Sequence, residues 1–194
     1  ELLKRARNAA VVAPTGVAAM HAGGQTIHSF FRLPPRLVEP ADIRRLRARR
    51  VVEALETLII DEISMVRADM MWAIDASLRL NRDRNEPFGG VQVILVGDLA
   101  QLPPVVQGEE AAYLEMAYGG PFFFHPPAFR DAGFTLFELE IVYRQSDPEF
   151  IDILNAVREG EISDRQAARL NARVTGRIGL EASGTHVVLS PTND

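Results

Sequence analysis

The sequence contains no cysteine in 194 residues, which excludes disulfide bonds and metal sites built on thiolates. Lysine is nearly absent as well, because Lys4 is the only one and the basic character rests on arginine. No apolar run is long enough to span a bilayer, so we expect no membrane partner. The formal net charge is −5, which argues against holding nucleic acid by bulk charge and leaves only local groups for such contacts.

Short apolar runs rich in β-branched residues alternate with segments of helical periodicity. Continuous apolar runs of this kind are typical of a parallel sheet covered on both faces, and the alternation predicts an α/β domain without a long interdomain linker. Helical periodicity is clearest in residues 67–82 and 148–159, with Ser146 or Asp147 as the cap of the second helix and Gly160 at its end. The predicted strands are residues 9–13, 57–61, 91–96, 134–139 and 186–189.

Two carboxylates, Asp61 and Glu62, stand at the carboxyl end of the second apolar run. In open α/β sheets, ligands bind at this edge. A carboxylate there can hold Mg²⁺ beside the phosphates of a nucleotide, and a second can polarise the attacking water. A solvated acidic pair at a strand-to-helix turn is the competing interpretation, since the chain has 26 acidic residues. The pair alone does not decide between the two.

A second polar segment follows the third apolar run, where Gly97 allows a sharp turn before Asp98 and Gln101. Gln101 both donates and accepts hydrogen bonds, which suits a sensor of a terminal phosphate and its attacking water. An ordinary turn capped by Asp98 is the alternative. Further along, Arg144 precedes the capped helix, where its guanidinium either reaches a γ-phosphate or faces solvent.

Hydroxyls, an imidazole and an aromatic ring gather just after the first apolar run. Hydroxyls and helix N-termini suit phosphates, and aromatic rings suit base stacking. The competing interpretation is a partly buried histidine for His28 and core packing for Phe30 and Phe31. Residues 44–50 include five arginines, a pattern of either a solvated helix face or a local basic patch. The candidate contacts are Pro14, Thr15, Gly16, Thr26, His28, Ser29 and Phe30.

Taken together, these segments resemble the superfamily-one DNA helicases of the Pif/RecD type. The stretch from Glu62 to Arg79 is similar to the signature segment of the Pif branch. The resemblance covers nearly the whole chain, and its motifs occur in the family's order. The matching stretches are APTGVAA (13–19), TIHSF (26–30), IIDEISMV (59–66), FGGVQVILVGDLAQLPPV (88–105), VYRQSDPEFIDILNAVREG (142–160) and LSPTN (189–193).

The resemblance implies a partial RecA-like P-loop NTPase domain over residues 1–194, the motor of an ATP-dependent 5′–3′ DNA helicase. ATP would bind with Asp61, Asp98, Gln101 and Arg144, with Asp61 on Mg²⁺ and Glu62 activating water. Gln101 would sense the γ-phosphate and Arg144 would stabilise its charge. Single-stranded DNA, duplex junctions and a second motor domain of the same chain are the implied partners. The implied boundaries are about 13–31 for DNA contacts, 57–66 for Walker B, 91–105 for the GDxxQ motif and 142–160 for the arginine motif.

Such motors also need a glycine-rich loop ending in Gly-Lys-Ser/Thr, whose amides and lysine hold the phosphates. No Gly-Lys pair occurs in this sequence. We therefore expect a fragment that lacks the first strand and the phosphate loop and hydrolyses little ATP by itself. Two other interpretations stay open: an α/β ATPase unrelated to nucleic acid, and a non-catalytic ATPase-like scaffold that acts as a binding module. The charged first residues do not form a secretory signal, and a cytoplasmic, bacterial-type location is expected.

Overall fold

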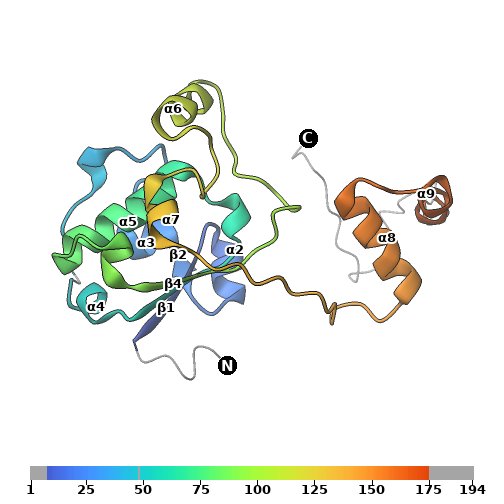
Figure 1. Ribbon diagram of the computed structural model, residues 1–194, viewed down its shortest axis with the longest axis horizontal. Helices are drawn as coiled ribbons and strands as arrows, with labels where there is room; N and C mark the ends of the chain where they lie inside the picture. Colours follow the sequence, from blue (N-terminus) through green and yellow to red (C-terminus); the bar gives the residue numbers. More distant parts are fainter. Residues whose placement is uncertain (1–7, 48, 175–194) are drawn as a thin grey trace, which may run out of the picture. The chain divides into compact units, whose positions relative to one another are not determined.

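The computed structural model describes residues 8–47 and 49–174 of the chain (Figure 1). The chain divides into two compact units, and the division falls between Glu138 and Leu139. The first unit holds the sheet and the main hydrophobic core, and the second holds the last two described helices. Within the described residues, no helix is long and apolar enough to cross a membrane.

The sheet has four strands in the order β2–β1–β3–β4, and every pairing between them is parallel. This confirms the parallel sheet with flanking helices that the sequence predicts. The two-residue strand β2 is not among the predicted strands, because so short a segment has no periodicity to detect. The strands are β1 (Ala9–Ala13), β2 (Gln25–Thr26), β3 (Thr57–Ile60) and β4 (Gln92–Leu95).

Helices connect the strands, and the longest described one, α5, contacts α4, α6 and α7 around the first unit (Figure 1). The helices are α2 (Gly16–His21), α3 (Ile27–Phe31), α4 (Arg49–Ala54), α5 (Ala68–Arg82), α6 (Glu109–Tyr118), α7 (Pro127–Ala132), α8 (Pro148–Glu159) and α9 (Asp164–Asn171). Short 3₁₀ turns are η1 (Pro40–Asp42), η2 (Ile63–Met65) and η3 (Pro87–Gly90).

The core of the first unit lies between the sheet and α5. Leu58 and Ile60 of β3 have no exposed surface, and neither do Ile74 and Leu78 of α5. Full burial of each such side chain stabilises the fold by about 1.5–3 kcal/mol. A parallel strand covered on both faces explains why β3 reads as an uninterrupted apolar run in the sequence. The core therefore fixes β3 in the middle of the sheet, with its carboxyl end leading to Asp61.

The prediction of a strand over residues 134–139 is wrong, because this segment forms no strand in the structure. Its apolar side chains are strongly exposed, with Leu136 at 89% and Phe137 at 83%. An apolar run shows that a segment can form a strand, but a strand also needs a neighbouring ladder. The predicted strand at 186–189 lies outside the described residues.

The predicted caps of α8 are confirmed. The Asp147 carboxylate accepts hydrogen bonds from the backbone N–H groups of Glu149 (3.0 Å) and Phe150 (3.2 Å). The helix ends at Gly160, whose φ of +75° is the left-handed conformation that glycine adopts without strain.

Candidate functional site

The carboxyl ends of the parallel strands share one edge of the sheet, and the predicted site residues of the first unit follow those ends. Thr15 comes after β1, Thr26 closes β2, Asp61 comes after β3 and Asp98 comes after β4. A backbone hydrogen bond from Asp61 N to Val12 O (2.9 Å) continues the pairing of β1 and β3 past the end of β3. The edge thus brings together polar groups that lie up to 83 residues apart in the sequence, the separation of Thr15 and Asp98.

The acidic pair occupies a tight turn between β3 and η2. The Asp61 carboxylate accepts a hydrogen bond from the Glu62 backbone N–H at 3.0 Å. Glu62 has a φ of +52°, a left-handed conformation that costs a residue with a Cβ about 1–2 kcal/mol. The next residue holds the turn in place, since buried Ile63 donates its N–H to Val96 O at 3.0 Å. Both carboxylates remain partly exposed at the edge.

The acidic pair fits Mg²⁺ better than a metal held by protein alone. Among the described residues, no group of three or more His, Asp or Glu side chains is arranged to hold a metal ion. Mg²⁺ commonly binds one or two carboxylates and takes its other ligands from phosphate and water. Asp61 and Glu62 offer such a donor set.

The loop after β4 lies against the acidic turn. A Cβ on Gly97 would come within 2.9 Å of the Ile63 backbone nitrogen, so only glycine allows this approach. The Asp98 carboxylate accepts hydrogen bonds from Ala100 N (3.0 Å) and from the Gln101 side-chain amide (3.2 Å). Asp98 therefore caps the turn, as the plainer interpretation of the sequence expects, and also orients the Gln101 amide.

Thr15 and Thr26 each cap a helix at the same edge. The Thr15 hydroxyl accepts a hydrogen bond from Ala18 N (3.2 Å) and the Thr26 hydroxyl from Ser29 N (3.1 Å). Each hydroxyl that accepts in this way keeps its own O–H to donate to a ligand. The Ser29 hydroxyl donates to the Gln25 side chain at 3.4 Å. Pro14 and Gly16 flank Thr15, with Pro14 in the short loop after β1 and Gly16 as the first residue of α2.

His28 and Phe30 lie on α3, just after the Thr26 cap. The pKa of His28 is lowered from its ordinary value, first by burial and then by the nearby Arg67 cation, while Asp69 opposes the shift. The imidazole is therefore neutral near pH 7. The Phe30 ring is partly buried against the core, with its centroid 4.8 Å from the centroid of Phe31. The core interpretation thus holds fully for Phe31 and partly for Phe30.

Comparison with known proteins decides the family. Residues 1–168 match the sequence profile of the PIF1-like helicases. The chain belongs to the PIF1-like helicase family. The human ATP-dependent DNA helicase PIF1 is 37% identical over 173 residues, which are 87% of this chain and 26% of that protein. The zebrafish ATP-dependent DNA helicase PIF1 is 40% identical over 162 residues, covering 81% of this chain and 24% of that protein.

A solved structure gives the same result for the fold. The crystal structure of Pif1 helicase from Bacteroides in complex with ADP-AlF3 and ssDNA matches this chain with a TM-score of 0.84 and 41% identity. The match covers 92% of this chain and 42% of that chain. This PIF1-like chain therefore spans about a quarter of the length of its curated relatives and less than half of the solved one.

The PIF1-like chain also holds a buried ionic group that the sequence pattern does not reveal. Asp69 has no exposed surface, and its carboxylate accepts hydrogen bonds from Arg67 Nε (2.9 Å) and Nη2 (2.8 Å). The same carboxylate accepts from Val38 N at 2.9 Å, and Arg67 also reaches Glu110 of α6 at 3.2 Å. The cluster ties the loop after α3 to α5 and α6. It therefore holds the cation that influences His28.

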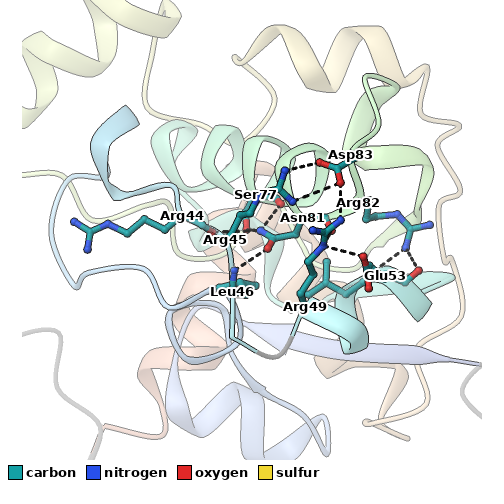
Figure 2. Close-up of polar contacts among 10 residues, drawn as sticks. Arg44, Arg45, Leu46, Arg49, Glu53, Ser77, Asn81, Arg82 and Asp83 are labelled. Carbon is teal, nitrogen blue, oxygen red and sulfur yellow. Dashed lines mark hydrogen bonds and ion pairs between the residues drawn. The ribbon is translucent and has the colours of Figure 1, made fainter.

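Three residues of the arginine-rich stretch, Arg45, Leu46 and Arg49, dock on the end of α5 (Figure 2). Arg45 and Arg49 both pair with Asp83, at 2.6 and 2.5 Å. Buried Asn81 accepts a hydrogen bond from Leu46 N at 2.7 Å. Arg82 donates to three carbonyl oxygens near the end of α4, those of Val52, Glu53 and Leu55. Part of the predicted basic surface is therefore neutralised within the fold.

Arg144 lies in the second unit, where it is exposed in the segment before α8. The predicted role of Arg144 at the γ-phosphate stays a prediction. The stretch at residues 189–193 lies outside the described part of the chain.

Proposed function

We propose that the carboxyl edge of this sheet is the ATP-hydrolysing and DNA-tracking edge of a 5′–3′ DNA helicase. In this proposal the chain forms part of the first motor domain of a longer protein. The observation that carries the proposal is the parallel order β2–β1–β3–β4, which gathers a carboxylate pair, an oriented amide and capping hydroxyls on one edge. Support comes from the relatives, named as ATP-dependent DNA helicases, and from a neighbour crystallised with ADP-AlF3 and ssDNA.

The proposal divides the nucleotide chemistry among three residues at the edge of the first unit and Arg144 of the second unit. Asp61 would hold Mg²⁺, which neutralises charge on the phosphates when it is bound. Glu62 would accept a proton from the attacking water and orient it for attack. Gln101, oriented by Asp98, would report the presence of the γ-phosphate to the loop that follows. Arg144 would add a fixed positive charge to stabilise the transferring phosphoryl group.

The DNA side of the edge relies on neutral donors. The capping hydroxyls of Thr15 and Thr26 can each donate one hydrogen bond to a backbone phosphate. Neutral donors suit a chain with a net charge of −5, because they contact phosphates without a basic surface. Contacts of this kind position a strand without reading its sequence. Neutral His28 would add a further hydrogen bond, and the partly exposed Phe30 ring would contact a base.

The proposal requires parts that this chain does not contain. A glycine-rich Gly-Lys-Ser/Thr loop must bind the phosphates, and a second motor domain must close over the nucleotide. The longer protein would then translocate on single-stranded DNA and unwind duplex at junctions, in the cytoplasm. This chain by itself would bind Mg-ATP weakly.

Phosphate release tests the proposal, measured for this chain and for a longer protein that includes the Gly-Lys-Ser/Thr loop. We expect negligible turnover by this chain and turnover by the longer protein that rises at least tenfold when a single-stranded oligonucleotide is added. Turnover that ignores the oligonucleotide would favour an ATPase unrelated to nucleic acid. A longer protein that neither hydrolyses nor binds ATP, by calorimetry, would favour a scaffold.

A further inference from the structure

The guanidinium of Arg67 has two carboxylate partners, and only one of them holds it firmly. The Asp69 carboxylate accepts from Arg67 Nε at 2.9 Å and from Nη2 at 2.8 Å. The Glu110 carboxylate accepts from Nη1 at 3.2 Å, longer than the roughly 2.7–2.9 Å of a strong charge-assisted hydrogen bond. The Asp69 side chain has no exposed surface, whereas that of Glu110 is 33% exposed. Asp69 therefore fixes the guanidinium, and Glu110 covers an edge that another acceptor can take.

Glu110 is also loosely attached to its own surroundings. Its Oε2 atom accepts from Gln107 N at a long 3.4 Å. It lies in the first turn of α6, a helix in which Leu114 is the one buried residue. The loop before α6 is open to solvent, with Leu102 at 68% exposure. Segments with so few buried apolar contacts move at low cost, so Glu110 can leave Arg67 without opening the core.

Arg67 lies beside the candidate DNA contacts of α3. Burial and then the Arg67 cation lower the pKa of His28, which places the positive charge near the imidazole. One turn earlier, Thr26 caps the same helix and keeps its hydroxyl proton for a ligand. The predicted DNA contacts at this edge are all neutral, whereas the planar fork of an arginine matches the oxygens of a phosphate. Arg67 is therefore placed to supply the charge that those contacts lack.

We propose that Arg67 is a further contact to the backbone of single-stranded DNA, and that Glu110 occupies its outer edge until a phosphate displaces it. This inference rests on the proposed function, because it needs DNA to lie along the carboxyl edge of the sheet. Asp69 orients the guanidinium before DNA arrives, so little side-chain freedom is lost on binding. Competition from Glu110 weakens the binding of every strand alike, because a phosphate contact carries no sequence information.

Glu110→Gln in the longer protein tests the competition. The glutamine oxygen can still accept from Arg67 and from Gln107 N, so the fold is kept, but a neutral amide competes less well with phosphate. We expect the affinity for a fluorescein-labelled oligothymidine, measured by anisotropy, to rise about three- to fivefold, an effect of the size that a partly exposed ion pair commonly has.

Glu109→Gln is the matched control. Glu109 is the exposed neighbour in the same turn of α6, so this variant removes the same charge without removing the acceptor of Arg67. Its affinity for oligothymidine should stay close to that of the unaltered protein. An equal rise in the two variants would reduce the effect to general electrostatics and overturn the proposal. The absence of a rise in Glu110→Gln overturns it as well.

A neutral pair at positions 67 and 69 tests the arginine itself. Arg67→Gln combined with Asp69→Asn keeps hydrogen-bonding groups at both positions and leaves no unpaired buried charge between them. For this double variant, the plot of log affinity for oligothymidine against log salt concentration should be less steep by about 0.7, the counterion release of one phosphate contact on a single strand. Adding Glu110→Gln should then have no further effect. A full three- to fivefold rise without the guanidinium contradicts the proposal.

Nucleotide binding separates this contact from the phosphate site of ATP. Without DNA, the affinity for Mg-ATP measured by calorimetry should be the same in Glu110→Gln and Glu109→Gln. A higher Mg-ATP affinity in Glu110→Gln alone would assign Arg67 to the nucleotide and overturn the proposal. The two proposals also fail separately. A longer protein that binds no oligothymidine refutes the DNA-tracking function, whereas oligothymidine binding that ignores Glu110→Gln refutes only the Arg67 contact.

Discussion

Removal of the buried Asp69 carboxylate is expected to destabilise the first unit strongly. Asp69 is fully buried and accepts three hydrogen bonds, two from Arg67 and one from Val38 N. Removing one partner of a buried ion pair costs about 3–5 kcal/mol, because the remaining charge stays in the protein without compensation. Glu110 offers Arg67 a second carboxylate at 3.2 Å, which lowers the cost, but the buried Val38 N–H loses its acceptor and raises it. We therefore expect Asp69→Ala to lose roughly 3–5 kcal/mol.

The sole tryptophan makes the measurement specific to the first unit. Trp72 lies on α5 and packs against the core, so its fluorescence in urea reports the unfolding of that unit. With a urea m-value of about 2 kcal/mol/M, the midpoint should fall by about 1.5–2.5 M. Arg45→Ala is the matched control: its ion pair with Asp83 is as short, at 2.6 Å, but half exposed, so the midpoint should hardly change. Similar midpoints for the two variants would refute burial as the source of the effect.

Two more stability predictions concern His28 in the candidate site and Arg82 at the end of α5. The pKa of His28 lies below that of an unfolded histidine, so the unfolded chain binds more protons as pH falls and stability drops below about pH 6.5. His28→Gln should make the urea midpoint less sensitive between pH 7.5 and pH 5.5, and an unchanged pH dependence would contradict this. Arg82→Ala should lose about 2 kcal/mol, because three carbonyl oxygens near the end of α4 lose a charged donor. Arg82→Lys should restore only part of that loss, and full restoration would argue against the fork geometry.

The sequence predicts the position of the polar residues at the carboxyl edge well because its signals are local. A buried parallel strand reads as an apolar run, and the polar residues that follow it must lie at the strand's carboxyl end. Asp61 and Asp98 are found in this way, and the structure places both after neighbouring strands. The close approach at Gly97 is also local, since glycine is the residue that such a turn requires.

The long-range contacts have no comparable signal. Asp69 accepts from Val38 N across 31 positions, and Asn81 accepts from Leu46 N across 35. No periodicity connects such pairs, so their buried carboxylate and amide look like ordinary helix residues in the sequence. The prediction of a strand over residues 134–139 fails for a related reason. The composition of this segment gives the capacity to form a strand, but the ladder partner that realises this capacity is decided by residues elsewhere.

The most direct test of the account is a comparison of two carboxylates at opposite ends of β3, made in the longer protein. Glu62 follows the strand at the candidate phosphate edge, and Glu56 precedes it at the other end. Glu62→Gln should keep Mg-ATP binding and lower DNA-stimulated phosphate release by about 10²–10⁴-fold, the usual contribution of a general base. Glu56→Gln should leave phosphate release unchanged. If Glu62→Gln hydrolyses ATP as fast as Glu56→Gln, the carboxyl edge is not the catalytic edge.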